Sequence, residues 1–177
     1  MRKNVVLIGF MGTGKTSSGR MLAQRLGSAF IDLDQKIERD NHMSIPQIFQ
    51  QQGESGFRTL EHQAVLEASQ HASAVISTGG GTVKDPHNMK ALRERGVIVC
   101  LRASVDAILD RTKKRGDRPV LDKADEGDRR EAIEKLLEER ASLYEQADFV
   151  VDTSDLSPMQ VVDKILRFLR IRGVIHG

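Results

Sequence analysis

The sequence predicts an α/β fold with a doubly wound parallel sheet, and two features of its apolar pattern support this prediction. Short runs rich in β-branched residues are continuous rather than alternating in polarity, as in strands that are covered on both faces. Longer amphipathic stretches separate these runs, and such βα alternation is typical of parallel sheets. The predicted strands occupy residues 5–8, 29–31, 74–76, 97–101 and 149–151.

Length and composition limit what kind of protein this is. With 177 residues, the chain is long enough to bury one hydrophobic core. It is shorter than chains that usually split into several domains, so we expect a single domain over residues 1–177. Apolar residues make up 39% and charged residues 29%, which indicates a folded globular protein rather than a disordered one. The 27 basic residues nearly balance the 25 acidic ones, which argues against a nucleic-acid-binding surface.

Targeting signals and cysteines are sparse. No stretch approaches the ~20 consecutive apolar residues that cross a bilayer, and the first residues enter a strand pattern without a signal-peptide core. We therefore expect a cytoplasmic monomer that contacts no membrane. Cys100, the single cysteine, lies in the apolar run 97–101 and leaves no partner for an internal disulfide or thiolate cluster. A small buried hydrophobic residue is its simplest interpretation.

A glycine-rich segment follows the first predicted strand. GFMGTGKT, residues 9–16, matches the pattern G-x-x-x-x-G-K-[ST] between a strand and an amphipathic helix. Gly12 and Gly14 let successive backbone N–H groups converge on phosphate oxygens, and the helix starting near Lys15 adds the positive end of its dipole. Lys15 is expected to reach the outer phosphates. Thr16 is expected to place its hydroxyl on Mg²⁺ between the β and γ phosphates.

We assign Thr13 and Ser17 to the same nucleotide site. A P-loop indicates a nucleotide and not a reaction, so the phosphate acceptor has to be inferred from the rest of the chain.

Two carboxylates stand where the second predicted strand ends, in FIDLD, residues 30–34. Ligands of open α/β sheets lie beyond the carboxyl ends of the strands, so Asp32 and Asp34 are expected to point toward the phosphate site. One acid can assist a metal while the other holds an acceptor hydroxyl and deprotonates it. The alternative is that Asp34 only caps a helix starting at Gln35.

An arginine and three glycines mark two further sites. Arg58 opens a predicted helix, where acidic residues are usual, and its placement is unfavourable unless an anion binds. A surface position without a ligand is the alternative. Glycines 79–81 follow the strand at 74–76 and expose backbone N–H groups at another strand end. A loose loop is the alternative there.

Two more arginines lie in charged stretches. Arg118 belongs to segment 113–127, which, like segment 35–56, breaks the βα rhythm and is a candidate for a lid or substrate cap. From a lid, Arg118 can neutralise charge on a transferred phosphoryl group. Arg140 lies on a helix predicted over 129–146, where an arginine is ordinarily solvated. For both segments, a solvated loop without function is the alternative.

Together these stretches closely resemble the shikimate kinases, small P-loop kinases related to the nucleoside-monophosphate kinases. The matching motifs, in the order of that family, span residues 9–148 and are GFMGTGKTSSG, DLD, GESGFRTLE, STGGGTV, RGDRPVL and ERASLYEQAD. The resemblance implies ATP-dependent phosphorylation of shikimate to shikimate 3-phosphate, on a five-stranded parallel sheet flanked by helices. It also implies a substrate-binding segment at about 33–61 and a mobile lid at about 112–124.

The resemblance further implies roles for individual residues in holding the acceptor. Asp34, Arg58, Gly80, Gly81 and Arg140 would bind shikimate, with both arginines on its carboxylate. Arginine forks match carboxylates with two hydrogen bonds, and a carboxylate such as Asp34 suits hydroxyl groups.

The same resemblance implies which residues bind the nucleotide and its metal. Lys15, Thr16 and Arg118 would serve ATP and its metal, with Lys15, Asp34 and Arg118 as the catalytic residues. Asp32 would stand with Thr16 at Mg²⁺, and Arg111 would lie against the adenine.

Two other functions remain open on the sequence alone. A gluconate kinase would use the same scaffold on another polyhydroxylated acid, although the combination of Asp34, Arg58, the three glycines and Arg140 favours shikimate. A nucleotide-dependent switch module is the other candidate, and the absence of an N-K-x-D guanine-binding motif argues against it.

Overall fold

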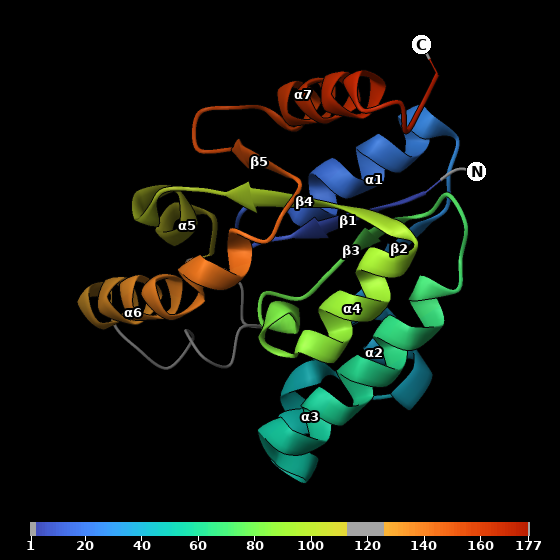
Figure 1. The fold of residues 1–177 in the computed structure, drawn as a ribbon. Helices are drawn as coiled ribbons and strands as arrows, with labels where there is room; N and C mark the ends of the chain where they lie inside the picture. The colour runs from blue at the N-terminus through green and yellow to red at the C-terminus, as the bar shows by residue number, and fades with distance from the viewer. Residues whose placement is uncertain (1–2, 113–125, 177) are drawn as a thin grey trace.

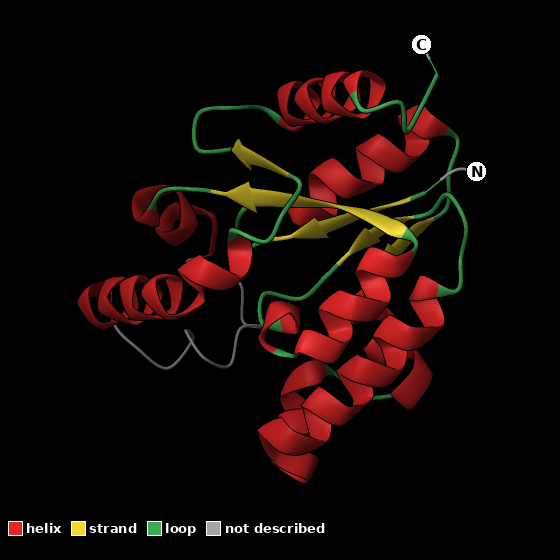
Figure 2. Cartoon of the chain, viewed as in Figure 1, coloured by secondary structure: helices red, strands yellow, loops and turns green. Residues whose placement is uncertain are grey.

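The fold is a five-stranded parallel sheet between two layers of helices (Figures 1 and 2), in a computed structural model that describes residues 3–112 and 126–176. The strand order is β2-β3-β1-β4-β5, so β1 occupies the centre. All pairings are parallel. The strands are β1 (Asn4–Ile8), β2 (Phe30–Asp32), β3 (Val75–Ser77), β4 (Gly96–Arg102) and β5 (Phe149–Asp152).

The helices divide between the two faces and one end of the sheet. α1 and α7 cover one face, α3 and α4 cover the other with α2 beside α3, and α5 and α6 lie beyond the carboxyl ends of the strands (Figure 1). Within the described ranges, no helix is long and apolar enough to span a membrane. The helices are α1 (Lys15–Leu26), α2 (Leu33–Asn41), α3 (Ile45–Ser69), α4 (Pro86–Glu94), α5 (Val105–Thr112), α6 (Glu126–Tyr144) and α7 (Pro158–Ile171), with a 3₁₀ turn η1 (Thr82–Lys84).

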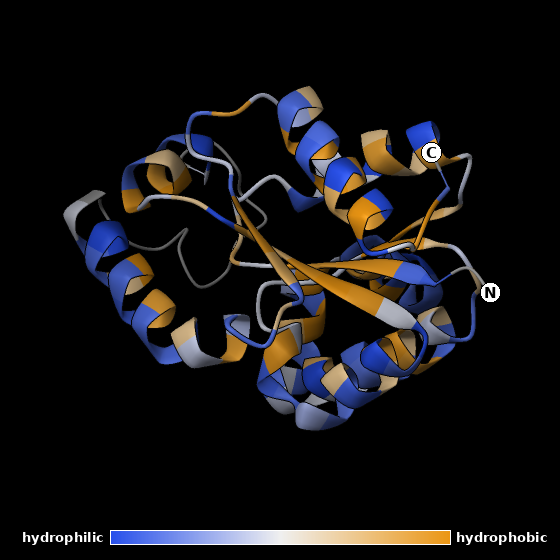
Figure 3. Cartoon of the chain, turned by 45° about the horizontal axis from the view of Figure 1, so that its top comes forward, coloured by the Kyte–Doolittle hydropathy of each residue, from blue (hydrophilic) through white to orange (hydrophobic). Residues whose placement is uncertain are grey.

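The central strand is buried on both faces, which explains its continuous apolar sequence. Val5 and Leu7 pack in the cluster under α1 and α7, whereas Val6 and Ile8 pack in the cluster under α3 and α4. Figure 3 shows the same contrast, with apolar strands inside and helices that are apolar on one side only. Cys100 is buried in this core, and burial raises the pKa of its thiol to about 11, so it is a buried hydrophobic residue as expected.

The predicted fold class and all five predicted strands are confirmed, and each strand boundary lies within one residue of its prediction. Segment 35–56, expected as an insertion, consists of most of α2 and the first part of α3. α3 is interrupted at Gly53, whose φ of 71° and ψ of −178° are not helical. The remainder of α3 after this break carries Arg58, which therefore lies one turn beyond the position predicted for it.

A buried asparagine joins β1 to the segment that precedes β3. Asn4 is 1% exposed, and its side-chain amide donates to His71 O at 2.8 Å and accepts from Ala74 N at 2.8 Å. Both polar atoms of the side chain are thereby paired. This clamp sets where β3 starts beside the central strand, at the end of the sheet opposite the P-loop.

Replacing Asn4 by alanine should therefore destabilise the fold. Asn4→Ala strands the backbone N–H of Ala74 and the carbonyl of His71, and an unpaired buried polar group costs about 1–3 kcal/mol. Urea unfolding monitored by circular dichroism should show this loss, with Gln63→Ala on the exposed face of α3 as the control within about 0.5 kcal/mol of the parent. Equal midpoints for both variants would contradict the assignment.

Candidate functional site

The loop between β1 and α1 folds around the side chain of Lys15. The Lys15 ammonium is buried and donates to Gly9 O at 2.7 Å and Phe10 O at 2.9 Å. Gly9 has a φ of 144°, and a Cβ there would lie 2.1 Å from Leu101 O, so only glycine fits. Gly14, at φ 94°, precedes α1, whose first turn has no acidic residue. No acidic side chain of α1 therefore opposes an anion at this helix start, where the helix dipole is positive.

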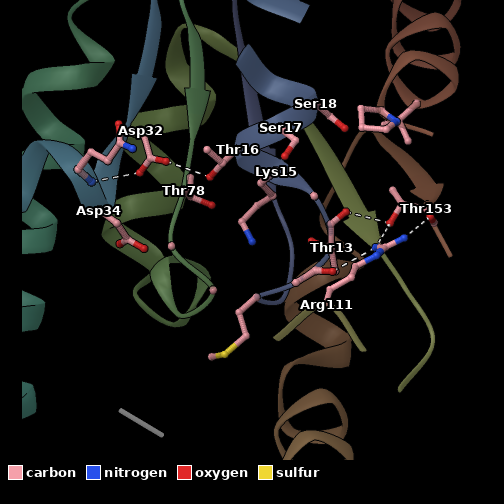
Figure 4. A pocket seen from close by; sticks show the side chains of 18 of the residues that line it. Thr13, Lys15, Thr16, Ser17, Ser18, Asp32, Asp34, Thr78, Arg111 and Thr153 are labelled. Atoms are coloured by element: carbon pink, nitrogen blue, oxygen red, sulfur yellow. Dashed lines mark hydrogen bonds between the residues drawn. The ribbon is translucent and has the colours of Figure 1, made fainter. Parts of the chain in front are cut away.

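A cavity of about 530 Å³ lies over this loop. In Figure 4, Asp32 and Asp34 stand on one side of Lys15, and Arg111 and Thr153 stand on the other. The volume falls in the range of small-ligand sites. The lining residues are Met11, Gly12, Thr13, Gly14, Lys15, Thr16, Ser17, Ser18, Asp32, Asp34, Gln35, Glu38, Ile45, Pro46, Thr78, Gly79, Gly80, Arg111, Thr153, Leu156, Pro158 and Val161.

Asp32 connects the P-loop helix to α2. Its Oδ2 accepts from Thr16 Oγ1 at 3.0 Å and its Oδ1 accepts from Gln35 N at 3.1 Å (Figure 4). Asp32 is thus the N-cap of α2, and the alternative that assigned this capping role to Asp34 is wrong because α2 starts at Leu33. One hydroxyl and one carboxylate oxygen side by side are oxygen donors of the type that Mg²⁺ prefers.

Asp34 lines the cavity from the first turn of α2, against the glycine loop that follows β3. A Cβ built on Gly79 would lie 2.9 Å from Asp34 Oδ1 and 3.3 Å from Glu61 Oε2. The absence of a side chain at Gly79 therefore lets two carboxylates approach this loop.

Arg58 reaches the same loop from α3. Its guanidinium donates to Glu61 Oε1 at 2.9 Å, and a Cβ on Gly81 would lie 2.5 Å from its Nη2. The Glu61 side chain is only 2% exposed, and its second oxygen accepts from Thr82 Oγ1 at 3.0 Å. The buried Nε of Arg58 finds no hydrogen-bond partner in the described part of the chain. Glu61, with Glu54 at 3.6 Å from Nη2, thus holds the guanidinium of Arg58 in place.

Arg140 reaches the loop from α6 and is buried rather than solvated, being 6% exposed. Its Nη1 donates to Gly80 O at 3.1 Å, and its guanidinium lies 5.5 Å from the centre of the Phe10 ring. Tyr144, one helical turn later, donates to the same oxygen at 2.9 Å. Burial raises the pKa of Tyr144 to about 12, so its hydroxyl keeps its proton and donates near neutral pH.

Arg111, at the end of α5, closes the other side of the cavity. Its two terminal nitrogens donate to Gly12 O, to the hydroxyl and carbonyl of Thr153, and to Ser154 O, at 2.7 to 3.4 Å. The N–H groups of a guanidinium lie in its own plane. The flat face of the group is what remains for stacking on a planar ligand.

The structure brings most of the predicted site residues to one edge of the sheet. The P-loop residues, Asp32, Asp34, Gly80 and Arg111 line the cavity directly. Arg58, Gly81 and Arg140 are not among its lining residues and adjoin it through the glycine loop. Arg118 and most of the expected lid lie outside the described residues.

Three residues of the site were missed from the sequence. Glu61 stands one helical turn after Arg58, a spacing that predicts an ion pair on any helix. Tyr144 stands one turn after Arg140 in the same manner. Thr153 carries no local signal, because its partners come from segments that are remote in sequence.

Comparisons with known proteins agree with this geometry. A family profile described as shikimate kinase matches residues 11–170. A shikimate kinase of Thermodesulfovibrio yellowstonii is 46% identical over 165 residues, covering 93% of this chain and 94% of the relative. A structure of the Acinetobacter baumannii shikimate kinase in complex with shikimate superposes with a TM-score of 0.92 at 35% identity, covering 97% and 95% of the two chains.

A more distant likeness bears on the alternative kinase. A gluconokinase from Sinorhizobium meliloti gives a TM-score of 0.63 at 18% identity, with 97% of this chain and 93% of that chain covered, and so shares only the fold. The profile match and the 46% identity, both over most of the chain, show that it belongs to the shikimate kinase family.

Proposed function

We propose that this chain transfers the γ-phosphoryl group of ATP to the 3-hydroxyl of shikimate, giving shikimate 3-phosphate and ADP for the synthesis of chorismate and aromatic amino acids. The observation that carries the proposal is the glycine loop, where Asp34, Arg58 and Arg140 meet beside the P-loop. An acidic acceptor with hydroxyl groups needs such a combination of two guanidinium groups and a carboxylate.

The nucleotide half of the reaction is assigned to the P-loop and α5. Backbone N–H groups of residues 12–17 bind the phosphates, and Lys15 balances their charge. Arg111 presents its flat face to the adenine, because its terminal N–H groups are already occupied by carbonyls and a hydroxyl. Arg118, in segment 113–125, is assigned to the transferred phosphoryl group.

Mg²⁺ is assigned to Thr16 and Asp32. The described residues contain no group of three or more His, Cys, Asp or Glu side chains that could hold a metal. That agrees with Mg²⁺, which keeps several waters and binds through one or two protein oxygens plus the phosphates. The bound ion would neutralise charge on the β and γ phosphates, while Asp32 keeps the Thr16 hydroxyl facing the site.

The acceptor half is assigned to Asp34 and the two arginines. Arg58 and Arg140 bind the carboxylate of shikimate, with N–H groups of Gly80 and Gly81 nearby. Asp34 orients the attacking hydroxyl. The oxygen of this hydroxyl forms a bond to the γ phosphorus as the bond between that phosphorus and the ADP oxygen breaks. Asp34 accepts the hydroxyl proton late, because a loose transition state needs little help from a general base.

The expected monomeric state and cytoplasmic location stay predictions, and size-exclusion chromatography and cell fractionation test them.

The function is tested with an ADP-release assay run with ATP and Mg²⁺. Parallel reactions contain shikimate, gluconate, AMP or no acceptor. ADP release should depend on shikimate. Equal release in all four reactions would indicate a nucleotide-hydrolysing switch module, and release with gluconate alone would identify the alternative kinase.

Asp34→Asn should lower kcat by about 10²-fold or more, because the amide cannot accept the hydroxyl proton and orients the hydroxyl poorly. ADP affinity, measured by calorimetry, should stay near that of the parent chain. Asp40→Asn on the exposed side of α2 is the matched control and should keep normal turnover. Near-normal turnover of the Asp34 variant would remove this residue from its assigned role.

Glu61→Gln should weaken shikimate binding while sparing ATP. The substitution keeps the shape of the side chain but removes the charge that holds Arg58, so the KM for shikimate should rise about tenfold. The KM for ATP should change less than about twofold. Glu67→Gln, a surface position on the same helix, is the control. A parallel rise of both KM values would indicate general damage to the site instead of lost positioning.

A further inference from the structure

The hydroxyl of Thr153 lies at a junction of three segments. Thr153 follows β5, is 3% exposed, and lies within hydrogen-bonding distance of Thr13 O at 2.9 Å and Arg102 O at 3.2 Å. The same oxygen accepts from Arg111 Nη1 at 3.1 Å. Figure 4 shows Thr13, Arg111 and Thr153 grouped on one side of the cavity.

The single proton of this hydroxyl can be assigned. Arg102 O already accepts from the backbone N of Thr153 at 2.8 Å, so it is satisfied without the side chain. Thr13 O is the nearer of the two acceptors. The hydroxyl therefore donates to the P-loop and accepts from Arg111, which links these two parts of the site through one oxygen atom.

This link orients peptide groups as well as a side chain. In a trans peptide, the carbonyl and the following N–H point in opposite directions. Thr153 holds the carbonyl of Thr13 and Arg111 holds that of Gly12, so the N–H groups of Thr13 and Gly14 point away from both. Those N–H groups belong to the loop assigned to the phosphates.

The position of Arg111 depends on the same residue. Two of its four terminal hydrogen bonds go to Thr153, one to the hydroxyl and one to the carbonyl, and a third goes to neighbouring Ser154. The hydroxyl bond contributes to the rotation of the guanidinium plane relative to the P-loop, together with the bonds to Gly12 O and Thr153 O. That rotation decides whether the flat face of Arg111 is parallel to a bound base.

We propose that Thr153 is a positioning residue for nucleotide binding. Its hydroxyl helps to fix the orientation of the flat face of Arg111 relative to the peptide groups of the P-loop. The inference rests on the proposed nucleotide site. The P-loop and Arg111 are both hydrogen-bonded to this one buried hydroxyl. Removing the hydroxyl should therefore lower the affinity for the intact nucleotide. The acceptor half, which contacts neither Thr153 nor Arg111, keeps its affinity.

The test compares Thr153→Val, which keeps the shape and removes the hydroxyl, with Thr153→Ser, which keeps the hydroxyl. Calorimetry should give an ADP Kd about tenfold higher for the valine variant and within about twofold of the parent for the serine variant. The Kd for shikimate should stay within about twofold for both. An unchanged ADP Kd in the valine variant, or serine as weak as valine, overturns the proposal.

A double-mutant cycle separates positioning from general stability. In an Arg111→Met background, Thr153→Val should weaken ADP binding by clearly less than about tenfold, because the part of the effect that acts through Arg111 is gone and only the hydrogen bond to Thr13 O is still lost. A full tenfold effect in that background overturns the proposal. If the valine variant fails to fold, Thr153→Ala carries the same expectations. ADP binding requires no phosphoryl transfer. If the chain did not phosphorylate shikimate, the proposed function would be wrong, but the ADP-binding test of Thr153 could still be interpreted.

Discussion

The proposed acceptor half of the site is built around three consecutive glycines after β3. A Cβ on Gly79 would approach Asp34 to 2.9 Å, one on Gly81 would approach Arg58 to 2.5 Å, and one on Gly80 would lie 3.4 Å from Arg140. Each glycine thus accommodates a different charged side chain from a different helix. Bare backbone is what allows α2, α3 and α6 to bring their functional groups to one loop.

The charges gathered there are held by contacts within the protein. Arg58 is held by the nearly fully buried Glu61, and Arg140 is held by Gly80 O and lies over the Phe10 ring of the P-loop. Holding a guanidinium in place at the outset removes part of the ordering cost of binding. The contact between Arg140 and Phe10 also joins the glycine loop to the P-loop.

Several residues of the site differ in position or role from what local sequence patterns predicted. Asp32, not Asp34, caps α2, because the helix starts two residues before the predicted start. Arg58 lies beyond the first turn of its helical segment, since α3 is interrupted at Gly53. Arg140 is buried and bonded to the glycine loop, so the alternative of an ordinary solvated helical arginine is wrong. The first two differences arise from residues close in sequence, Gln35 and Gly53, whereas the partner of Arg140 is Gly80, which is 60 residues away.

The strands, the P-loop and the fold class could be predicted from the amino-acid sequence alone. These features follow from local rules: continuous apolar runs, glycines at strand ends and a lysine at a helix start. Family resemblance added the acceptor residues by name. The i,i+3 spacing of Arg58 and Glu61 is local, but the burial of this pair and the partners of Tyr144 and Thr153 are known only from the folded chain, because Gly80 and Thr13 are remote from them in sequence.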